Sequence, residues 1–146
     1  MTKYYFDMDG TLADLYSVDN VFKRLDSGDA TTYSEAKPIN KYIDMLHKLQ
    51  QGGNPIGIIT HLGRHPKDAT YDKDEMDRQT IINKKQWLID NNIKVDSFIS
   101  APYGTNKYEL AIEADGGMGA TGVLVDDDDK VLATWFSNKI KATKDN

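Results

Sequence analysis

A pair of closely spaced aspartates is the feature of this sequence best suited to chemistry. Asp7 and Asp9 stand at the end of an apolar run, with one residue between them and Gly10 directly after them. Two carboxylates this close repel each other, and a hard divalent cation with oxygen ligands is the usual way to hold both of them charged. Asp7 can point at a substrate from the end of a strand, while a turn at Gly10 swings Asp9 back beside it. One carboxylate would then attack phosphorus and the other would carry the proton.

Apolar runs of strand length alternate with segments of helical periodicity along the chain. The runs are Tyr4 to Met8, Ile56 to Thr60, Ser97 to Ser100 and Gly122 to Val125. The expected helices are Ile39 to Gln51, Ile81 to Asn91, Lys107 to Ala114 and Lys130 to Phe136. This alternation predicts an α/β fold, a Rossmann-like doubly wound parallel sheet with helices on both faces. Ligands of such sheets bind beyond the carboxyl ends of the strands, so we expect the chemistry there.

The chain has the size of a single domain, residues 1–146, and its 39% hydrophobic content can furnish one core. Two polar stretches without clear periodicity, Ser27 to Ser34 and His61 to Asp74, are candidates for mobile loops over a site. The glycine-rich stretch Gly116 to Gly122 is expected to be only a turn. The tail Lys139 to Asn146 is expected to be frayed.

Composition and charge exclude several classes of function. There is no cysteine, which excludes a disulfide framework, a thiolate metal site and a cysteine nucleophile. The N-terminus carries aspartates where a signal peptide needs an apolar run, so we expect a cytoplasmic protein that does not act at a membrane. The formal net charge of −5 argues against a broad grip on a nucleic-acid backbone, which makes a nucleic-acid partner unfavoured.

The sequence DMDGT at residues 7–11 resembles the first motif of the haloacid dehalogenase superfamily of phosphatases, a strand followed by DxDGT or DxDGV. The longer match DMDGTLAD is similar to the 5′(3′)-deoxyribonucleotidase branch. The second motif of the superfamily, a strand ending in Thr or Ser, is matched at Thr60, and the third, a Lys, at Lys107. The fourth, a strand ending in paired acids, is matched at Asp126 and Asp127. The motifs occur in the superfamily's order and cover nearly the whole chain.

The resemblance implies hydrolysis of a phosphate monoester through an aspartyl-phosphate, with Mg2+ as cofactor. It assigns the nucleophile to Asp7 and the general acid/base to Asp9. Mg2+ would bind Asp126 directly, together with the Asp7 carboxylate and the Asp9 backbone carbonyl. Asp127 would act through a water molecule.

Elementary electrostatics agrees with phosphate-binding roles for Thr60, His61 and Lys107. Thr60 can offer its hydroxyl, and Thr60 and His61 their backbone N–H groups, to phosphate oxygens at a strand-to-loop turn. Lys107 would neutralise charge near Asp7 and the phosphoryl group. Positioning and electrostatics supply most of what phosphoryl transfer needs.

Two other lysines compete for the role of Lys107. Lys84 and Lys85 fall within a helical pattern that precedes Trp87. We therefore expect both to form the solvated face of that helix and favour Lys107.

Further charged residues lie next to the motifs. Asp128 and Asp129 extend the acidic run and are expected at the N-terminus of a helix, where they complement the dipole. His61, Arg64 and His65 follow the second motif, where they either contact substrate or remain exposed.

The cap that related enzymes insert between the first two motifs is expected to be small. Only residues 15–37 remain for a cap or lid once Ile39 to Gln51 is assigned to the core, so the site should be rather open. Tyr16, Phe22 and Tyr33 either offer a stacking surface for a base or pack a core or lid.

The favoured substrate is a small phosphorylated molecule such as a nucleotide. One alternative is a module that binds or sequesters a nucleotide with little turnover. Another is a phosphatase that acts on a nucleic-acid end, which an open site permits and the acidic surface disfavours. The sequence does not indicate an oligomeric state.

Overall fold

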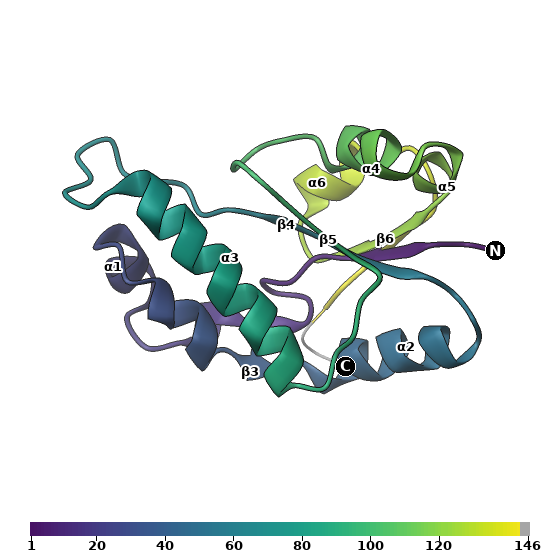
Figure 1. The fold of residues 1–146 in the computed structure, drawn as a ribbon, viewed down its shortest axis with the longest axis horizontal. Coiled ribbons are helices and arrows are strands. Elements are labelled where there is room, and N and C mark those ends of the chain that lie inside the picture. Colours follow the sequence, from purple (N-terminus) through teal and green to yellow (C-terminus); the bar gives the residue numbers. More distant parts are fainter. Residues whose placement is uncertain (144–146) are drawn as a thin grey trace.

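A five-stranded sheet forms the centre of the molecule in the computed structural model, which describes residues 1–143. Its strands are β1 (Tyr4–Phe6), β4 (Ile56–His61), β5 (Ser97–Ala101), β6 (Val123–Asp126) and β7 (Lys139–Lys141). The order is β5-β4-β1-β6-β7, and every neighbouring pair is parallel. β4 and β6 flank β1 on opposite sides, so the winding of the chain reverses at β1 (Figure 1). The predicted doubly wound α/β fold is confirmed.

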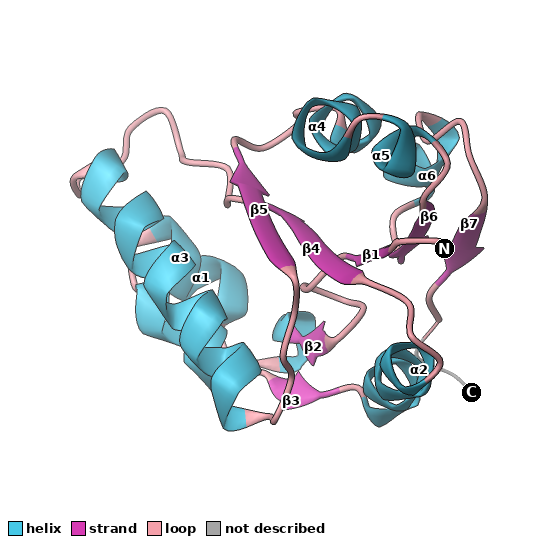
Figure 2. Cartoon of the chain, turned by 45° about the vertical axis from the view of Figure 1, so that its right-hand side comes forward, coloured by secondary structure: helices cyan, strands magenta, loops and turns pink. Residues whose placement is uncertain are grey.

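Helices cover both faces of this sheet. α2 (Asn40–Gln51) lies on one face, and α4 (Lys107–Asp115), α5 (Gly117–Ala120) and α6 (Asp129–Ala133) lie on the other (Figure 2). Successive side chains of a strand enter different cores: Phe6 and Ile58 join one buried cluster, whereas Tyr5 and Ile59 join the other. Because both faces of the strands are buried, their sequences are continuous apolar runs instead of alternating ones.

A helical lobe stands beside the sheet. It consists of η1 (Leu15–Ser17), α1 (Val21–Asp26), η2 (Ala30–Glu35) and α3 (Lys73–Asp90), with a small ribbon of β2 (Ala13–Asp14) and β3 (Lys37–Pro38) beneath it (Figure 1). α3 packs along η2 and is tied to it by hydrogen bonds from Asn83 Nδ2 to the Ala30 carbonyl (2.9 Å) and from Trp87 Nε1 to the Ala36 carbonyl (2.7 Å). Most of this lobe is the segment in which a small cap is expected.

The helix predicted over Ile81 to Asn91 begins eight residues earlier than expected. Asp72 caps it by accepting a hydrogen bond from the Glu75 N–H at 3.1 Å, and acidic residues fill its first turn. In the first half of α3 only Met76 and Thr80 are buried, so the apolar residues there show little helical periodicity. No helix within residues 1–143 is both long and apolar enough to cross a membrane.

Two further expectations at the C-terminal end are wrong. The stretch Gly116 to Gly122 contains the short helix α5, in which a Cβ on Gly119 would lie 2.1 Å from the Ala111 carbonyl oxygen. The glycine thus allows α5 to touch α4 closely. The tail is not frayed at its start, because β7 pairs with the outer edge of β6 and so provides partners for the backbone hydrogen-bonding groups there. The remainder of the predicted tail, residues 144–146, lies outside the described residues.

Trp135 joins α6 to the sheet and offers a test of this packing. It is fully buried, its ring lies 5.6 Å from that of Tyr5 and 5.1 Å from that of Tyr108, and Nε1 donates to the Gly122 carbonyl at 3.1 Å. We expect Trp135→Ala to lower the free energy of unfolding by about 3–5 kcal/mol. Phe136→Ala, a change at the neighbouring residue that is 81% exposed, should cost less than about 1 kcal/mol. Denaturant titration of both variants checks this, and equal losses would contradict it.

Candidate active site

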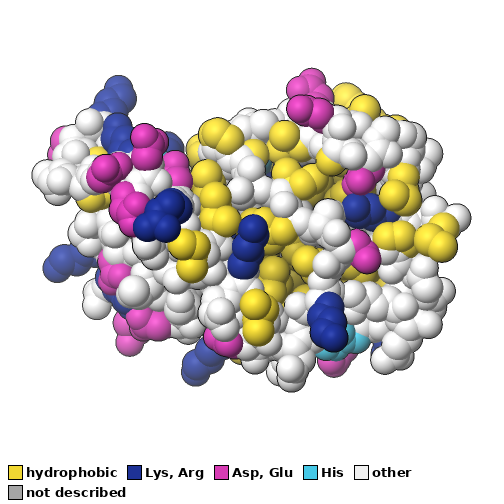
Figure 3. Space-filling view, in the orientation of Figure 1, with side chains coloured by type: hydrophobic (Ala, Val, Ile, Leu, Met, Phe, Trp, Pro, Cys, Tyr) yellow, Lys and Arg dark blue, Asp and Glu magenta, His cyan; other side chains and the backbone are white. Residues whose placement is uncertain are grey.

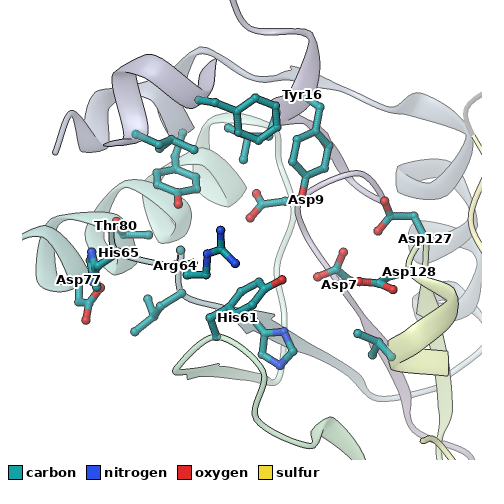
Figure 4. A pocket seen from close by; sticks show the side chains of 18 of the residues that line it. Asp7, Asp9, Tyr16, His61, Arg64, His65, Asp77, Thr80, Asp127 and Asp128 are labelled. Carbon is teal, nitrogen blue, oxygen red and sulfur yellow. The ribbon is translucent and has the colours of Figure 1, made fainter. Parts of the chain in front are cut away.

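Three parallel strands bring the predicted site residues to one edge of the sheet. Asp7 directly follows β1, Thr60 lies near the end of β4, and Asp126 ends β6. The carboxyl ends of neighbouring parallel strands lie side by side, which makes this edge the expected ligand site. A cavity of about 950 Å3 opens there (Figure 4). Its lining includes all the predicted site residues except Thr60: Asp7, Asp9, His61, Lys107, Asp126 and Asp127.

Lys107 fastens two of these strand ends together. It is the first residue of α4, and its side chain is 2% exposed. Its Nζ donates to Asp7 Oδ1 at 3.0 Å and to Asp126 Oδ2 at 2.8 Å. Burial alone would lower the pKa of Lys107, but the two carboxylates outweigh it and raise that pKa above its ordinary value. Lys107 is therefore a permanent cation between Asp7 and Asp126.

Three carboxyl groups beside Lys107 form a cluster that fits a hard cation. Ligand oxygens of Asp7, Asp126 and Asp127 all lie within 4.8 Å of one another. Burial, followed by the charge of Asp7, raises the pKa of Asp126 to about 6 and that of Asp127 to about 8. The cluster is thus short of positive charge even with Lys107 present. Oxygen ligands at this spacing suit Mg2+.

The carboxylate of Asp9 does not join this cluster. Its Oδ2 instead accepts a hydrogen bond from Lys84 at 2.9 Å. Burial and the charge of Asp7 raise the pKa of Asp9, and Lys84 opposes them. The expected role of its backbone carbonyl as a metal ligand stays a prediction.

Gly10 makes the turn between Asp7 and the rest of the first motif possible. Its φ of 86° lies in the left-handed region that favours glycine. A Cβ at this position would also lie 2.2 Å from Asp127 Oδ2. The glycine therefore allows Asp127 to approach the loop that carries Asp9.

The expectation that Lys84 lies on a solvated helix face is wrong. Lys84 is 1% exposed, and its Nζ donates to Asp9 Oδ2, to Thr60 Oγ1 at 2.7 Å and to the His61 carbonyl at 3.0 Å. Lys85 is exposed, as predicted. The sequence does hold a signal for this difference, because the buried face of α3 follows helical spacing: Met76, Thr80, Lys84, Trp87 and Leu88.

The end of β4 and the loop that follows it line the cavity with two histidines and an arginine. His61 Nε2 donates to the Thr105 carbonyl at 2.7 Å, and burial lowers the pKa of His61. His65 lies within hydrogen-bond distance of both the Tyr71 hydroxyl and Asp77, at 2.8 Å each. Arg64 stands between them and extends toward the centre of the cavity (Figure 4). Its guanidinium makes no hydrogen bond or ion pair to any side chain within residues 1–143.

Aromatic side chains of the helical lobe form the outer wall of the cavity. The rings of Tyr16 and Phe22 stack at a centroid distance of 6.1 Å, and these residues are 52% and 64% exposed. Tyr33 is buried and belongs to the core. Two of the three predicted stacking residues are thus accessible to a ligand.

The acids that follow Asp127 are helix-terminal, as predicted. Asp128 caps α6 by accepting a hydrogen bond from the Lys130 N–H at 2.8 Å, and Asp129 pairs with Lys141 at 2.8 Å. Lys and Arg side chains are scattered singly over the face in Figure 3 and form no continuous basic stripe there. Apolar side chains gather near the centre of that face, where Figure 1 shows the edge strand β5.

No protein-family model and no curated protein matches the sequence. Among solved structures, the chain is similar to one in "Structure of Pnkp1/Rnl/Hen1 complex", with a TM-score of 0.71 and 16% identity over 97% of this chain and 45% of that chain. A chain in "Structure of the Pnkp1/Rnl/Hen1 RNA repair complex" gives a TM-score of 0.71 and 18% identity over 97% of this chain and 42% of that one. The present chain therefore spans less than half of both.

A D,D-heptose 1,7-bisphosphate phosphatase from Burkholderia thailandensis is also similar, with a TM-score of 0.54 and 10% identity over 93% of this chain and 75% of that chain. At such identities these likenesses show a shared fold. The fold is consistent with the core that the resemblance to the haloacid dehalogenase superfamily implies. None of these three structures is described as a nucleotidase.

The carboxylate cluster predicts stabilisation by Mg2+. An ion that binds only the folded chain stabilises it by mass action, by about 2.7 kcal/mol at a concentration of 100 times Kd. We expect Mg2+ to raise the thermal midpoint of the wild-type chain and to have little effect on Asp126→Ala. Asp68→Asn is the matched control, because Asp68 is exposed and belongs neither to the cluster nor to the lining of the cavity. An unchanged Mg2+ affinity of Asp126→Ala in calorimetry would refute the site.

Proposed function

We propose that this chain is a Mg2+-dependent phosphatase that hydrolyses a phosphate monoester through an aspartyl-phosphate on Asp7. The main support is that Lys107 Nζ donates hydrogen bonds to both Asp7 and Asp126, with Asp127 beside them. The proposed nucleophile and the proposed cation site are thus held together at the carboxyl edge of the sheet. The shared fold with a phosphatase supports the same reaction class.

The proposed reaction has two steps. In the first, a carboxylate oxygen of Asp7 attacks phosphorus, the bond from phosphorus to the leaving oxygen breaks, and Asp9 gives that oxygen a proton. In the second, water attacks the phosphorus of the aspartyl-phosphate and Asp9 takes the proton of that water. Inorganic phosphate leaves and Asp7 is regenerated. The raised pKa of Asp9 supports its ability to carry the proton.

The remaining groups would hold the phosphoryl oxygens in place. Mg2+, held by Asp7, Asp126 and Asp127, would supply positive charge that offsets the charge of the phosphoryl group. Lys107 keeps Asp7 directed at the cavity, and the Thr60 hydroxyl is a donor at the end of β4. Because Asp7, Lys107 and Asp126 are buried, the interactions among their charges are stronger than in water.

Replacing the nucleophile gives the sharpest test. Asp7→Asn keeps the shape of the side chain but cannot attack phosphorus, so turnover of p-nitrophenyl phosphate should fall by more than about 10³-fold while the thermal midpoint changes little. Asp68→Asn, at an exposed residue outside the cavity lining, should keep wild-type turnover. Activity of Asp7→Asn within tenfold of wild type would refute the mechanism. Tight nucleotide binding without any wild-type turnover would favour a binding module instead.

A second candidate function is dephosphorylation of a nucleic-acid end. The cavity of about 950 Å3 is much larger than a phosphate group, and its outer wall carries the exposed rings of Tyr16 and Phe22. Base–aromatic stacking is a common means of binding single strands. The fold shared with chains of an RNA repair complex supports this candidate. Because the net charge of the chain is −5, we expect such a substrate to contact the protein through its terminal nucleotides only.

A comparison of substrates separates these candidates. If a base stacks on the outer wall, Tyr16→Ala should lower kcat/KM for a nucleotide or a phosphorylated oligonucleotide by about tenfold, since stacking contributes about 1–3 kcal/mol per base. Turnover of p-nitrophenyl phosphate should remain unchanged. A preference of the wild type for the oligonucleotide over the mononucleotide would favour the nucleic-acid end. Equal effects of Tyr16→Ala on all substrates would contradict base stacking.

A further inference from the structure

Lys84 is a buried lysine with no part in the phosphoryl transfer described above. It reaches the site from the middle of α3, in the helical lobe, whereas Lys107 reaches it from α4 on the other side. Its acceptors are Asp9 Oδ2, Thr60 Oγ1 and the His61 carbonyl, at 2.9, 2.7 and 3.0 Å. An ammonium group has three protons, so these acceptors account for its full donor capacity.

The donor role of Lys84 determines what its two side-chain partners can do. Thr60 Oγ1 accepts from Lys84, and Thr60 is fully buried and does not line the cavity, so this contact anchors the ammonium group to the end of β4. Because Lys84 holds Oδ2 of Asp9, Oδ1 is the oxygen available to the leaving group in the cavity that Asp9 lines. The ammonium group of Lys84, anchored at the end of β4, thus fixes the orientation of the Asp9 carboxylate.

Lys3 is a further buried lysine, and its ion pair lies away from the site and serves as a structural comparison for that of Lys84. Lys3 Nζ donates to Asp115 Oδ2 and Ser97 Oγ at 2.9 Å each, and it lies 5.2 Å from the centre of the Tyr5 ring. Lys84 lies 5.0 Å from the centre of the Tyr33 ring. The two lysines therefore share burial, a carboxylate, a hydroxyl and an aromatic ring. They differ in location, because Lys3 precedes β1, at the opposite end of the strand from Asp7.

We propose that Lys84 is a positioning residue of the active site, which orients Asp9 for proton transfer. This inference rests on the proposed phosphatase function. It assigns to α3, and so to the helical lobe, a direct part in the geometry of catalysis. It also explains why a lysine occupies an otherwise apolar helix face, where an unpaired charge would be costly.

The test is the dependence of the loss on the leaving group. A poor leaving group needs a proton from Asp9, whereas p-nitrophenolate does not. We expect Lys84→Met to lower kcat/KM, which covers the steps up to departure of the leaving group, by about 100-fold for an alkyl phosphate and by less than about tenfold for p-nitrophenyl phosphate. Asp9→Asn should show the same split. An equal loss on both substrates would mean that Lys84 binds the transferred phosphate itself, and wild-type kinetics would mean that it has no role. Both outcomes overturn the inference.

Lys3→Met is the matched control for the loss of a buried lysine. It should lower the free energy of unfolding without any split between the two substrates. A split in Lys3→Met as large as in Lys84→Met would show that lost stability alone causes the effect, and would overturn the inference.

A double variant keeps the test decisive if Lys84→Met does not fold. Asp9→Asn with Lys84→Met leaves no unpaired charge in the pair, so it should fold. Since Lys84 acts on the alkyl phosphate mainly through Asp9, the double variant should lose no more than about threefold beyond Asp9→Asn alone. Fully multiplicative losses would overturn the inference. Inactivity of the wild type on p-nitrophenyl phosphate with Mg2+ would instead refute the proposed function itself.

Discussion

The crowding of buried carboxylates at one edge of the sheet is the constraint on which the rest of this structure depends. Asp7 and Asp126 are 7% and 1% exposed, and Asp127 stands next to both. Buried acids without compensation would be protonated or would destabilise the fold. Lys107 and Lys84 supply the compensation, each through hydrogen bonds shorter than or equal to 3.0 Å. A divalent cation would complete it.

This constraint links the site to elements on both sides of the sheet. Lys107 comes from the first turn of α4, whose start is defined by the cap at Asn106, and Lys84 comes from α3 in the helical lobe. The position of both helices therefore bears directly on the geometry of Asp7 and Asp9. The lobe also supplies the aromatic outer wall of the cavity, so the proposed contact with substrate and the proposed positioning of Asp9 belong to the same unit.

Much of the fold and part of the site could be predicted from the sequence. The strands that end near Asp7, Thr60 and Asp126 are continuous apolar runs because both faces of the sheet are buried, and this pattern is easily recognised. Lys84 could not be assigned from its type, because lysine is almost always exposed; only its helical spacing from Met76 and Trp87 places it on the buried face.

Other misses have different physical causes. β7 consists of the exposed residues Lys139–Lys141, so no apolar run marks it, and its order comes from pairing with β6. The short α5 depends on the close approach of Gly119 to α4, a tertiary contact that local sequence does not reveal. The start of α3 lies in a polar stretch, where the cap at Asp72 is the main signal. Pairing and packing partners, more than local propensity, decide these elements.

The most direct measurement is mass spectrometry of the protein quenched during turnover of a phosphate monoester with Mg2+. Since Asp9 assists hydrolysis of the intermediate, Asp9→Asn with an activated ester should accumulate the phosphorylated form. We predict one added phosphoryl group, located on the peptide that contains Asp7. Release of inorganic phosphate in a single turnover without a phosphorylated peptide, or a phosphoryl group on another residue, would contradict the account.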